Sequence, residues 1–221
     1  MTQIQAAHAA SQKTGFSDGS SLDSSLEMIG AVMNFRRNEE IYGEGEAAEY
    51  LYLVKTGCVR AYKILSDGRR QVGAFYLPGD VFGIEADAEH THSTEAVGSC
   101  AVVVFKRSAL ASRATGNSKL SQLLLDLTIN ELKRAQNHIL LLIQSAQERV
   151  AGFLLEMAAR ERKSGEINLP MSRQDIADYL GLTIETVSRT LTQLENNRAI
   201  ALPSSRRVVL RNYGALARLN A

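Results

Sequence analysis

The sequence predicts an α+β protein in three parts: an antiparallel β-roll, a long helix, and a winged helix-turn-helix at the carboxy-terminal end. Three observations lead to this prediction. Short apolar runs broken by glycines between Phe35 and Phe105 are typical of antiparallel strands. A stripe of apolar residues spaced alternately by four and three follows Gly116 and Asn117, which indicates a long helix. Residues 171–195 then carry the pattern of a helix-turn-helix.

The composition is that of a globular chain. It has 221 residues, of which 45% are hydrophobic and 22% are charged, and this excludes a disordered or fibrous protein. The formal net charge is only +1, so any DNA-binding surface must be local. Residues 147–221 hold 11 basic and 8 acidic side chains, against 14 and 16 in residues 1–146. The mild positive excess places such a surface in the carboxy-terminal third.

The spacing of the cysteines and the lack of a targeting segment in the sequence indicate a cytoplasmic protein. Cys58 and Cys100 are far apart and lie in apolar stretches, whereas a disulfide scaffold or a zinc module needs clustered cysteines. The first 25 residues are polar and rich in serine, and no run of 18 apolar residues occurs. We therefore expect no signal peptide, no membrane partner and no bound cofactor.

The β-roll is expected from strands at residues 51–54, 58–65, 71–77 and 101–105. Asp67 and Gly68 predict a hairpin with a type I′ turn. That turn needs positive φ angles, which glycine adopts without steric cost. Several such strands at nearly regular spacing favour a small antiparallel barrel or roll.

The long helix carries a predicted dimer seam. A 4-3 spacing keeps one stripe on one helix face, and two such helices form a left-handed coiled coil in which polar Gln136 sets the register. The alternative is that the stripe packs on its own β domain, and Leu140, Leu141 and Leu142 suggest a second buried side. The stripe continues to Ala146 and Val150, and a second helix is expected over residues 146–163. The predicted seam residues are Leu125, Ile129, Leu132, Gln136, Ile139 and Ile143.

The helix-turn-helix is predicted from five positions. Ser172 with Asp175 three residues later caps the first helix, and Ala177 is small where the two helices cross. Gly181 ends the first helix in a left-handed conformation. Val187, six residues after Gly181, is expected in the core.

The second helix carries the candidate base-reading residues. Thr183 caps it, and Val187, Leu191 and Leu194 form its buried face. Its early, opposite face presents an arginine for guanine O6 and N7, a glutamate for cytosine N4, and a serine. The alternative is an ordinary surface ion pair between Glu185 and Arg189, which is compatible with base reading. The predicted base-reading residues are Ile184, Glu185, Ser188 and Arg189.

A β-hairpin wing is expected from residues 199–202 and 207–210, with arginines at its tip. Contacts to phosphate there would add affinity without sequence information, although exposed arginines are often only solvated. The predicted DNA-backbone residues are Ser172, Arg173, Thr183, Thr186, Arg206 and Arg207.

Over residues 28–215 this order of parts resembles the CRP/FNR superfamily of bacterial transcription regulators. The signatures are residues 51–54 followed by Gly57, Asp67-Gly68-Arg69, the Pro-Gly-Asp-Val-Phe-Gly run at 78–83, and Ala146-Gln147-Glu148-Arg149-Val150. The Glu185, Ser188 and Arg189 set is similar to that of FNR-type members. The resemblance implies a homodimer on a palindrome like TTGAT-N4-ATCAA, with half-sites ~34 Å apart.

Two departures from the family pattern select the branch. A cyclic-nucleotide pocket needs a glutamate, present here as Glu85, and a later arginine, yet residues 90–94 contain none. The first 57 residues hold no cysteine, so the FNR-type iron–sulfur cluster is excluded. The chain therefore resembles the FixK-like branch, which implies an activator of microaerobic or anaerobic respiration or nitrogen-fixation genes that contacts RNA polymerase.

Three other functions can be compared with the same residues: a metal protein, an enzyme and a ligand-gated regulator. His90 and His92 alternate as in a two-nitrogen metal site, but two histidines are more often a polar loop. An enzyme is not expected, because no three-ligand spacing is present. A ligand-gated regulator with an unidentified effector in the β-roll remains the alternative. We expect a flexible segment at 1–27, the β-roll at 28–118, the dimerisation helix at 119–146 and the winged domain at 147–221.

Overall fold

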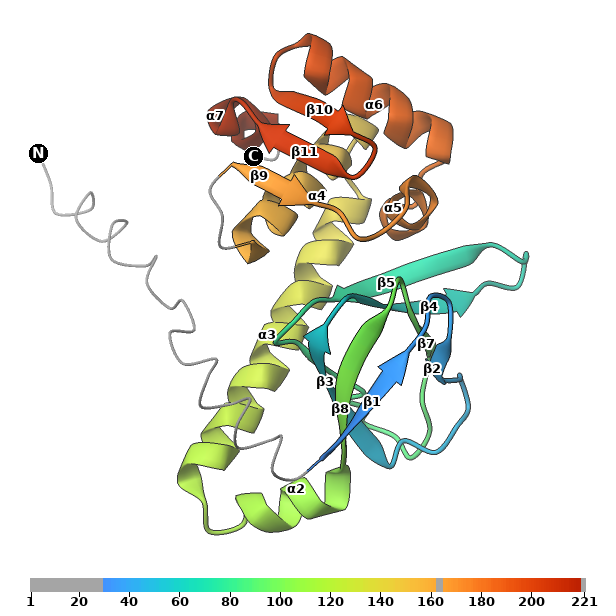
Figure 1. The fold of residues 1–221 in the computed structure, drawn as a ribbon, viewed down its shortest axis with the longest axis vertical. Coiled ribbons are helices and arrows are strands. Elements are labelled where there is room, and N and C mark those ends of the chain that lie inside the picture. Colours follow the sequence, from blue (N-terminus) through green and yellow to red (C-terminus); the bar gives the residue numbers. More distant parts are fainter. Residues whose placement is uncertain (1–29, 162–164, 220–221) are drawn as a thin grey trace, which may run out of the picture.

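The computed structural model describes residues 30–161 and 165–219, and the predicted flexible segment 1–27 lies outside them. The β-roll occupies the lower right of the view, and the long helix α3 (Ser118–Leu142) runs along its side (Figure 1). The winged domain lies above both. The α+β architecture in three parts is therefore confirmed.

The β-roll consists of two four-stranded antiparallel sheets, in the orders β1-β8-β3-β6 and β2-β7-β4-β5. Their inner faces are apolar, and Val54, Val59 and Val102 are completely buried between them. The four predicted strands correspond to β3, β4, β5 and β8. The strands are β1 (Ala31–Phe35), β2 (Glu40–Tyr42), β3 (Tyr50–Thr56), β4 (Val59–Ile64), β5 (Arg70–Tyr76), β6 (Val81–Phe82), β7 (Ser93–Ala96) and β8 (Cys100–Lys106).

The hairpin between β4 and β5 forms as predicted, but its turn is not of type I′. A type I′ turn needs positive φ at two successive residues, and here Gly68 has φ 83° whereas Asp67 does not have a positive φ. The Gly68 N–H donates to the Leu65 carbonyl at 2.9 Å, and the Leu65 N–H donates to the Arg69 carbonyl at 2.8 Å. One left-handed residue suffices because this loop is longer than two residues.

Helix α2 (Arg107–Ala114) leads from the β-roll into α3, whose first turn is capped by Asn117. One face of α3 packs on the β-roll through Leu120, Leu124 and Leu127. The predicted seam lies on another face and is exposed, so the alternative that it packs on its own β domain is wrong. The exposed fractions are Leu125 52%, Ile129 51%, Leu132 58%, Ile139 64% and Ile143 77%.

The stripe does not continue to Val150, contrary to the prediction. Helix α3 ends at Leu142, and a new helix, α4 (Ala146–Arg160), begins behind a capping box formed by Ser145 and Glu148. Val150 is only 1% exposed, because it packs in the core of the winged domain. Helix α4 also ends at Arg160, earlier than the expected 163.

The winged domain surrounds α4 with β9 (Glu166–Asn168), α5 (Arg173–Leu180), α6 (Ile184–Asn196), β10 (Ile200–Ser204), β11 (Arg207–Leu210) and α7 (Tyr213–Leu219). The predicted wing forms as β10 and β11, and β9 adds a third strand on the β11 side. Phe153, Ile176 and Leu191 are buried in the shared core. Within the described residues, no helix has the length and apolarity to cross a membrane.

Candidate nucleic-acid interface

The turn between α5 and α6 has the predicted geometry. The Asp175 N–H donates to Ser172 Oγ at 3.1 Å, and the Ser172 N–H donates to Asp175 Oδ2 at 2.9 Å, so the capping box is closed. Gly181 has φ 62° and ψ 39°, the left-handed conformation that ends α5. Ala177 is completely buried, and its small side chain allows the two helices to approach closely.

Helix α6 is anchored by its buried face and by its amino-terminal cap. The Thr186 N–H donates to Thr183 Oγ1 at 3.2 Å, which confirms the predicted cap. Val187, Leu191 and Leu194 are each at most 2% exposed. Because this face is fixed in the core, the opposite face of α6 must point outward.

The predicted base-reading residues share that outward face. Ile184, Glu185, Ser188 and Arg189 are all exposed, and α6 lies on the side of the winged domain turned away from the β-roll (Figure 1). The Ser188 hydroxyl donates to the Ile184 carbonyl at 2.8 Å. Among the described residues, neither Glu185 nor Arg189 forms an ion pair or a side-chain hydrogen bond, so the alternative surface pair is not formed. Both side chains remain available to a ligand.

The candidate residues for contacts to the DNA backbone differ in burial and in the hydrogen bonds that they already make. Arg173 begins α5, is half-buried, and carries a buried Nη1 that has no hydrogen-bond partner among the described residues. Burial lowers the pKa of its guanidinium. Ser172 and Thr183 already serve as caps, and the Thr186 hydroxyl lies 3.0 Å from that of Thr183.

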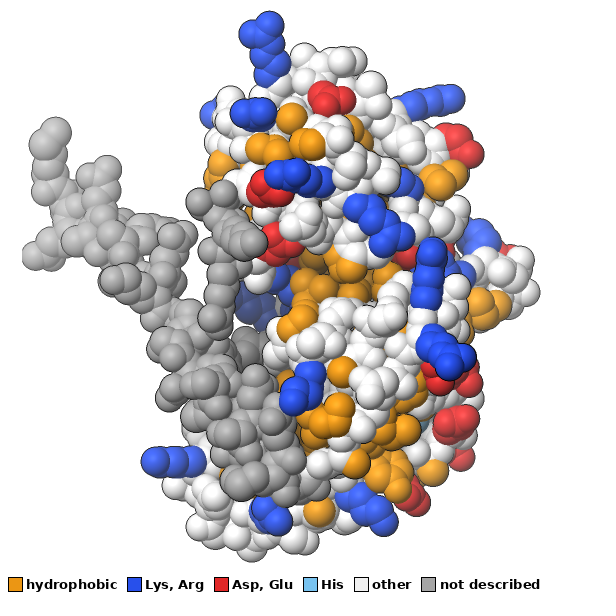
Figure 2. Space-filling view, viewed as in Figure 1, with side chains coloured by type: hydrophobic (Ala, Val, Ile, Leu, Met, Phe, Trp, Pro, Cys, Tyr) orange, Lys and Arg blue, Asp and Glu red, His pale blue; other side chains and the backbone are white. Residues whose placement is uncertain are grey.

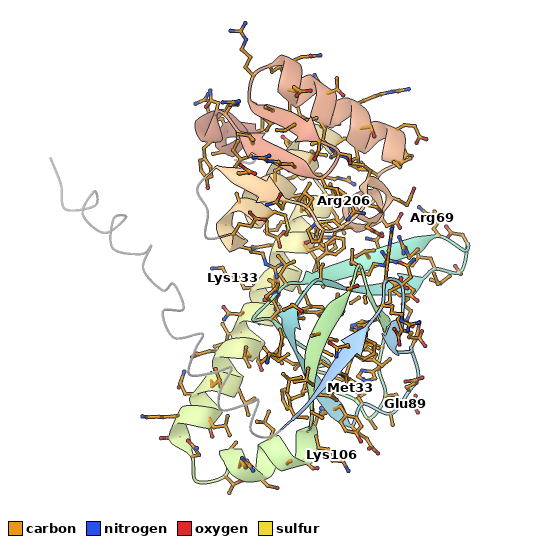
Figure 3. The ribbon with its side chains drawn as sticks, in the orientation of Figure 1. Met33, Arg69, Glu89, Lys106, Lys133 and Arg206 are labelled. Carbon is orange, nitrogen blue, oxygen red and sulfur yellow. The ribbon has the colours of Figure 1, made fainter. Side chains whose placement is uncertain are left out.

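The two wing arginines differ from one another. Arg207 is ion-paired with Glu166, with its Nη2 2.9 Å from Glu166 Oε2. Arg206 donates from Nη1 to the Pro170 carbonyl at 2.8 Å and has no acidic partner among the described residues (Figure 3). Both line a cleft of about 1390 Å³ at the junction of the winged domain, α3 and the β-roll. On the face shown in Figure 2, apolar side chains gather at the junction between the upper and lower parts of the molecule.

The β-roll segment that lacks the family's arginine is filled by its own side chains. The His90 ring stacks on Tyr42 with centroids 3.5 Å apart, and His90 is only 3% exposed. The Thr91 hydroxyl donates to Glu85 Oε2 at 3.1 Å, and His92 Nδ1 lies 3.8 Å from Glu85 Oε1. No group of three or more His, Cys, Asp or Glu side chains is arranged to hold a metal ion in the part of the chain described.

Both cysteines are buried, as expected for apolar packing rather than reactivity. Cys58 is 1% exposed and Cys100 is 4% exposed. Burial raises the pKa of the Cys58 thiol to about 12, and it also raises that of Cys100. Neither side chain belongs to the candidate DNA face.

Sequence reasoning missed the contacts that join the winged domain to the β-roll. Arg60 and Arg70 of the β4–β5 hairpin reach Asp175 and Asp178 of α5, and His138 of α3 reaches Tyr179. One signal was present: Arg60 is a charged residue between the apolar neighbours Val59 and Ala61. Its partner in the winged domain, Asp175, lies 115 residues away, so spacing did not reveal the contact.

Comparison with known proteins agrees with this architecture. The family described as Crp-like helix-turn-helix domain matches residues 148–219, and the cyclic nucleotide-binding domain family matches residues 32–115. The nitrogen fixation regulation protein FixK of Azorhizobium caulinodans is 51% identical over 199 residues, which cover 87% of this chain and 80% of that protein. FixK of Rhizobium meliloti is 43% identical, with 85% and 86% covered. The structure of FixK2 from Bradyrhizobium japonicum has a TM-score of 0.83 at 49% identity and covers 87% of this chain and 98% of that one.

Proposed function

This chain belongs to the CRP/FNR superfamily as a FixK-like DNA-binding transcription regulator for nitrogen-fixation or anaerobic genes, and from this premise we propose its mode of binding. It binds as a homodimer, without a bound effector, to a palindrome like TTGAT-N4-ATCAA. Each protomer places one α6 in the major groove, in successive turns of the duplex ~34 Å apart. At its promoters it acts as an activator that contacts RNA polymerase.

The observation that carries this proposal is that Glu185 and Arg189, on the outward face of α6, have no ion pair or side-chain hydrogen bond among the described residues. Arg189 is free to donate to O6 and N7 of a guanine, and Glu185 is free to accept from N4 of a cytosine. Ser188 lies between them, and Ile184 offers an apolar contact at the start of the helix. A surface ion pair would have to be broken before these groups met bases, and no such pair is present in the described residues.

The candidate contacts to the DNA backbone come from the starts of α5 and α6 and from the wing. Arg173 is the strongest candidate, because its half-buried guanidinium has no acidic partner among the described residues and a phosphate would supply one. Arg206 contributes a further positive charge from the wing, whereas Arg207 must first leave Glu166. Ser172, Thr183 and Thr186 lie at the amino-terminal ends of α5 and α6, where backbone N–H groups favour phosphate.

The dimer is supported by the exposed stripe on α3. Five large apolar side chains that are each more than half exposed form one face of the helix, which is unfavourable in water. A second copy of the same helix covers them in a left-handed coiled coil, with Gln136 setting the register. The division into a β-roll at 28–118, a dimerisation helix at 119–146 and a winged domain at 147–221 follows these roles.

The absence of an effector is supported by the β-roll. Residues 90–94 supply no arginine for a cyclic phosphate, and Tyr42, His90 and Glu85 fill that region with contacts to one another. A ligand-gated regulator is the second candidate, favoured by the buried Nε2 of His92, which has no partner among the described residues.

Equilibrium binding to a duplex carrying TTGAT-N4-ATCAA tests the proposal, with scrambled half-sites as the control. The measurement uses purified protein in air, without added ligand, at one stated salt concentration, because phosphate contacts make affinity depend on salt. Tight binding specific to the palindrome is the expected result. Equal, weak binding to both duplexes would contradict it, and stabilisation of the folded protein by a metabolite would then identify a missing effector.

A further inference from the structure

We propose that Arg60 and Arg70 of the β-roll are positioning residues for DNA recognition. They hold α5, and through α5 the recognition helix α6, in the orientation that lets both helices of the dimer enter one duplex together. The inference rests on the proposed homodimer and adds the groups that set the placement of its DNA-reading helices. Arg60 belongs to β4 and Arg70 to β5, and these two strands lie below α5 in the view of Figure 1, whereas α6 lies above it.

Arg60 is a buried cation with a partner for each part of its guanidinium. It is 7% exposed in its side chain, and its Nη1 lies 2.7 Å from Asp175 Oδ1. Its Nε donates to Glu95 Oε1 at 2.8 Å, and its Nη2 donates to Asn38 Oδ1 at 3.1 Å. Since Asn38 and Glu95 belong to the β-roll and Asp175 belongs to α5, one buried charge joins the two domains.

Arg70 makes a second connection beside the first. Its Nη2 donates to Asp175 Oδ1 at 2.7 Å, and its Nε donates to Asp178 Oδ2 at 2.8 Å. The side chains of Asp175 and Asp178 are only 4% and 12% exposed, so salt screens these pairs less than it screens surface pairs. We call Arg60, Arg70, Asp175 and Asp178 the interdomain lock.

Asp175 connects the lock to the helix-turn-helix directly. Its Oδ1 receives the two arginines, while its Oδ2 accepts the N–H and the hydroxyl of Ser172 in the capping box. The same carboxylate therefore fixes the first turn of α5 and ties that turn to the β-roll. Because α5 and α6 pack closely across Ala177 and Gly181, the direction of α6 follows that of α5.

The lock matters most when two half-sites are read at once. Once one α6 has bound, the second binds at an effective concentration that depends on how narrowly its position is restricted. A winged domain that moves relative to the β-roll spreads that position over a larger volume and lowers the effective concentration. Binding to a single half-site needs no such alignment. The lock is therefore expected to change the preference for a palindrome over a half-site, rather than the affinity of one α6.

The test compares Arg70→Gln with its neighbour variant Arg69→Gln. Arg69 lies at the hairpin turn with a side chain that is 78% exposed, and Asp67 is its only ionic partner in the described part of the chain, so it is a matched control (Figure 3). Full-length dimers are titrated with the palindrome and with a duplex that carries one half-site, at the same salt concentration. We expect Arg70→Gln to lower the affinity for the palindrome about tenfold and to leave the half-site within about twofold, while Arg69→Gln changes neither.

Two further variants separate the lock from a general loss of folding. Arg60→Gln removes the more buried arginine and is expected to act in the same direction, with thermal unfolding and sedimentation confirming a folded dimer. Where Arg60→Gln does not fold, the more exposed Arg70 decides the question. Asp178→Asn added to Arg70→Gln is expected to cause little further loss, because the two residues act as one pair.

Three results would overturn the inference. An unchanged ratio of palindrome to half-site affinity in Arg70→Gln shows that the lock does not position α6. Equal losses on both duplexes show that Arg70 only supports the folding of α5. A gain on the palindrome shows that the lock holds the domain away from DNA. If the unaltered protein itself lacked a preference for the palindrome, the proposed function would be contradicted instead.

Discussion

His138 of α3 lies flat on Tyr179 of α5, with ring centroids 4.0 Å apart and ring planes 2° apart. Its Nε2 also donates to the Tyr179 carbonyl at 2.8 Å. The helix that carries the predicted dimer seam therefore touches the helix-turn-helix directly. Burial lowers the pKa of this imidazole, and hydrogen bonds to the backbone of Tyr179 and Gly73 only partly oppose that effect.

This contact predicts a pH dependence of stability. The pKa of His138 is lower in the folded chain than its unfolded value of about 6.5, so below that pH the unfolded chain binds more protons. The free energy of unfolding is expected to fall as the pH drops from about 6.5 toward the folded pKa. His138→Gln should flatten the curve of urea unfolding against pH. Burial also lowers the pKa of His92, and His92 contributes to the pH dependence of stability in the variant and in the unaltered protein alike. An identical slope in the variant would contradict the prediction.

Arg189→Ala is expected to remove discrimination at one guanine of each half-site. A bidentate contact to a base contributes about 1–3 kcal/mol of discrimination, so the variant should bind the substituted and unsubstituted duplexes nearly equally. Competition binding with single-base variants of the palindrome measures this. Asn196→Ala, an exposed change at the far end of α6, is the control and should retain the preference. Unchanged discrimination in Arg189→Ala would assign the reading to another residue.

The double variant Ile139→Glu with Ile143→Glu is expected to be monomeric. Both side chains are more than 60% exposed in the single chain, and a dimer that covers them would have to bury two carboxylates per protomer. Sedimentation velocity gives the mass directly. Asn137→Glu is the control, because Asn137 is exposed on the cleft side of α3, away from the stripe. A double variant that stays dimeric would place the interface elsewhere.

Arg206→Ala is expected to weaken binding to all sequences alike. Among the residues that the structure describes, its guanidinium is held only by the Pro170 carbonyl, so it can turn to a phosphate at small cost. Removing it should lower the slope of log affinity against log salt by about one. Arg207→Ala should change this slope less, because Glu166 already neutralises Arg207. A loss confined to the palindrome would mean that Arg206 takes part in base reading.

Cys58 is expected to resist alkylation in the folded protein. Burial raises the pKa of its thiol to about 12, and the thiolate is the reactive form. Mass spectrometry after brief iodoacetamide treatment near pH 8 should show little modification of Cys58 until guanidinium unfolds the chain. Rapid labelling of Cys58 in the native protein would contradict the buried position.

Local features of this protein followed from the sequence because neighbours along the chain decide them. The cap at Ser172, the left-handed Gly181 and the cap at Thr183 each depend on residues within four positions, and the structure confirms all three. The apolar stripe on α3 followed from helical spacing in the same way. The type of turn at Asp67 and Gly68 was predicted wrongly. The length of the loop between the strands selects the turn type, and two residues alone do not define that length.

Only the tertiary structure decided how the parts meet. Whether the stripe is buried or exposed depends on which face of α3 the β-roll covers. Val150 does not belong to the stripe, because a new helix starts at Ala146. The contact of Arg60 with Asp175 spans 115 positions. No local pattern marks such a pair, because a buried charge finds its partner only after the chain has brought distant segments together. The sequence thus identified the candidate residues for reading DNA, and the tertiary structure showed that their helix-turn-helix packs on the β-roll through α5.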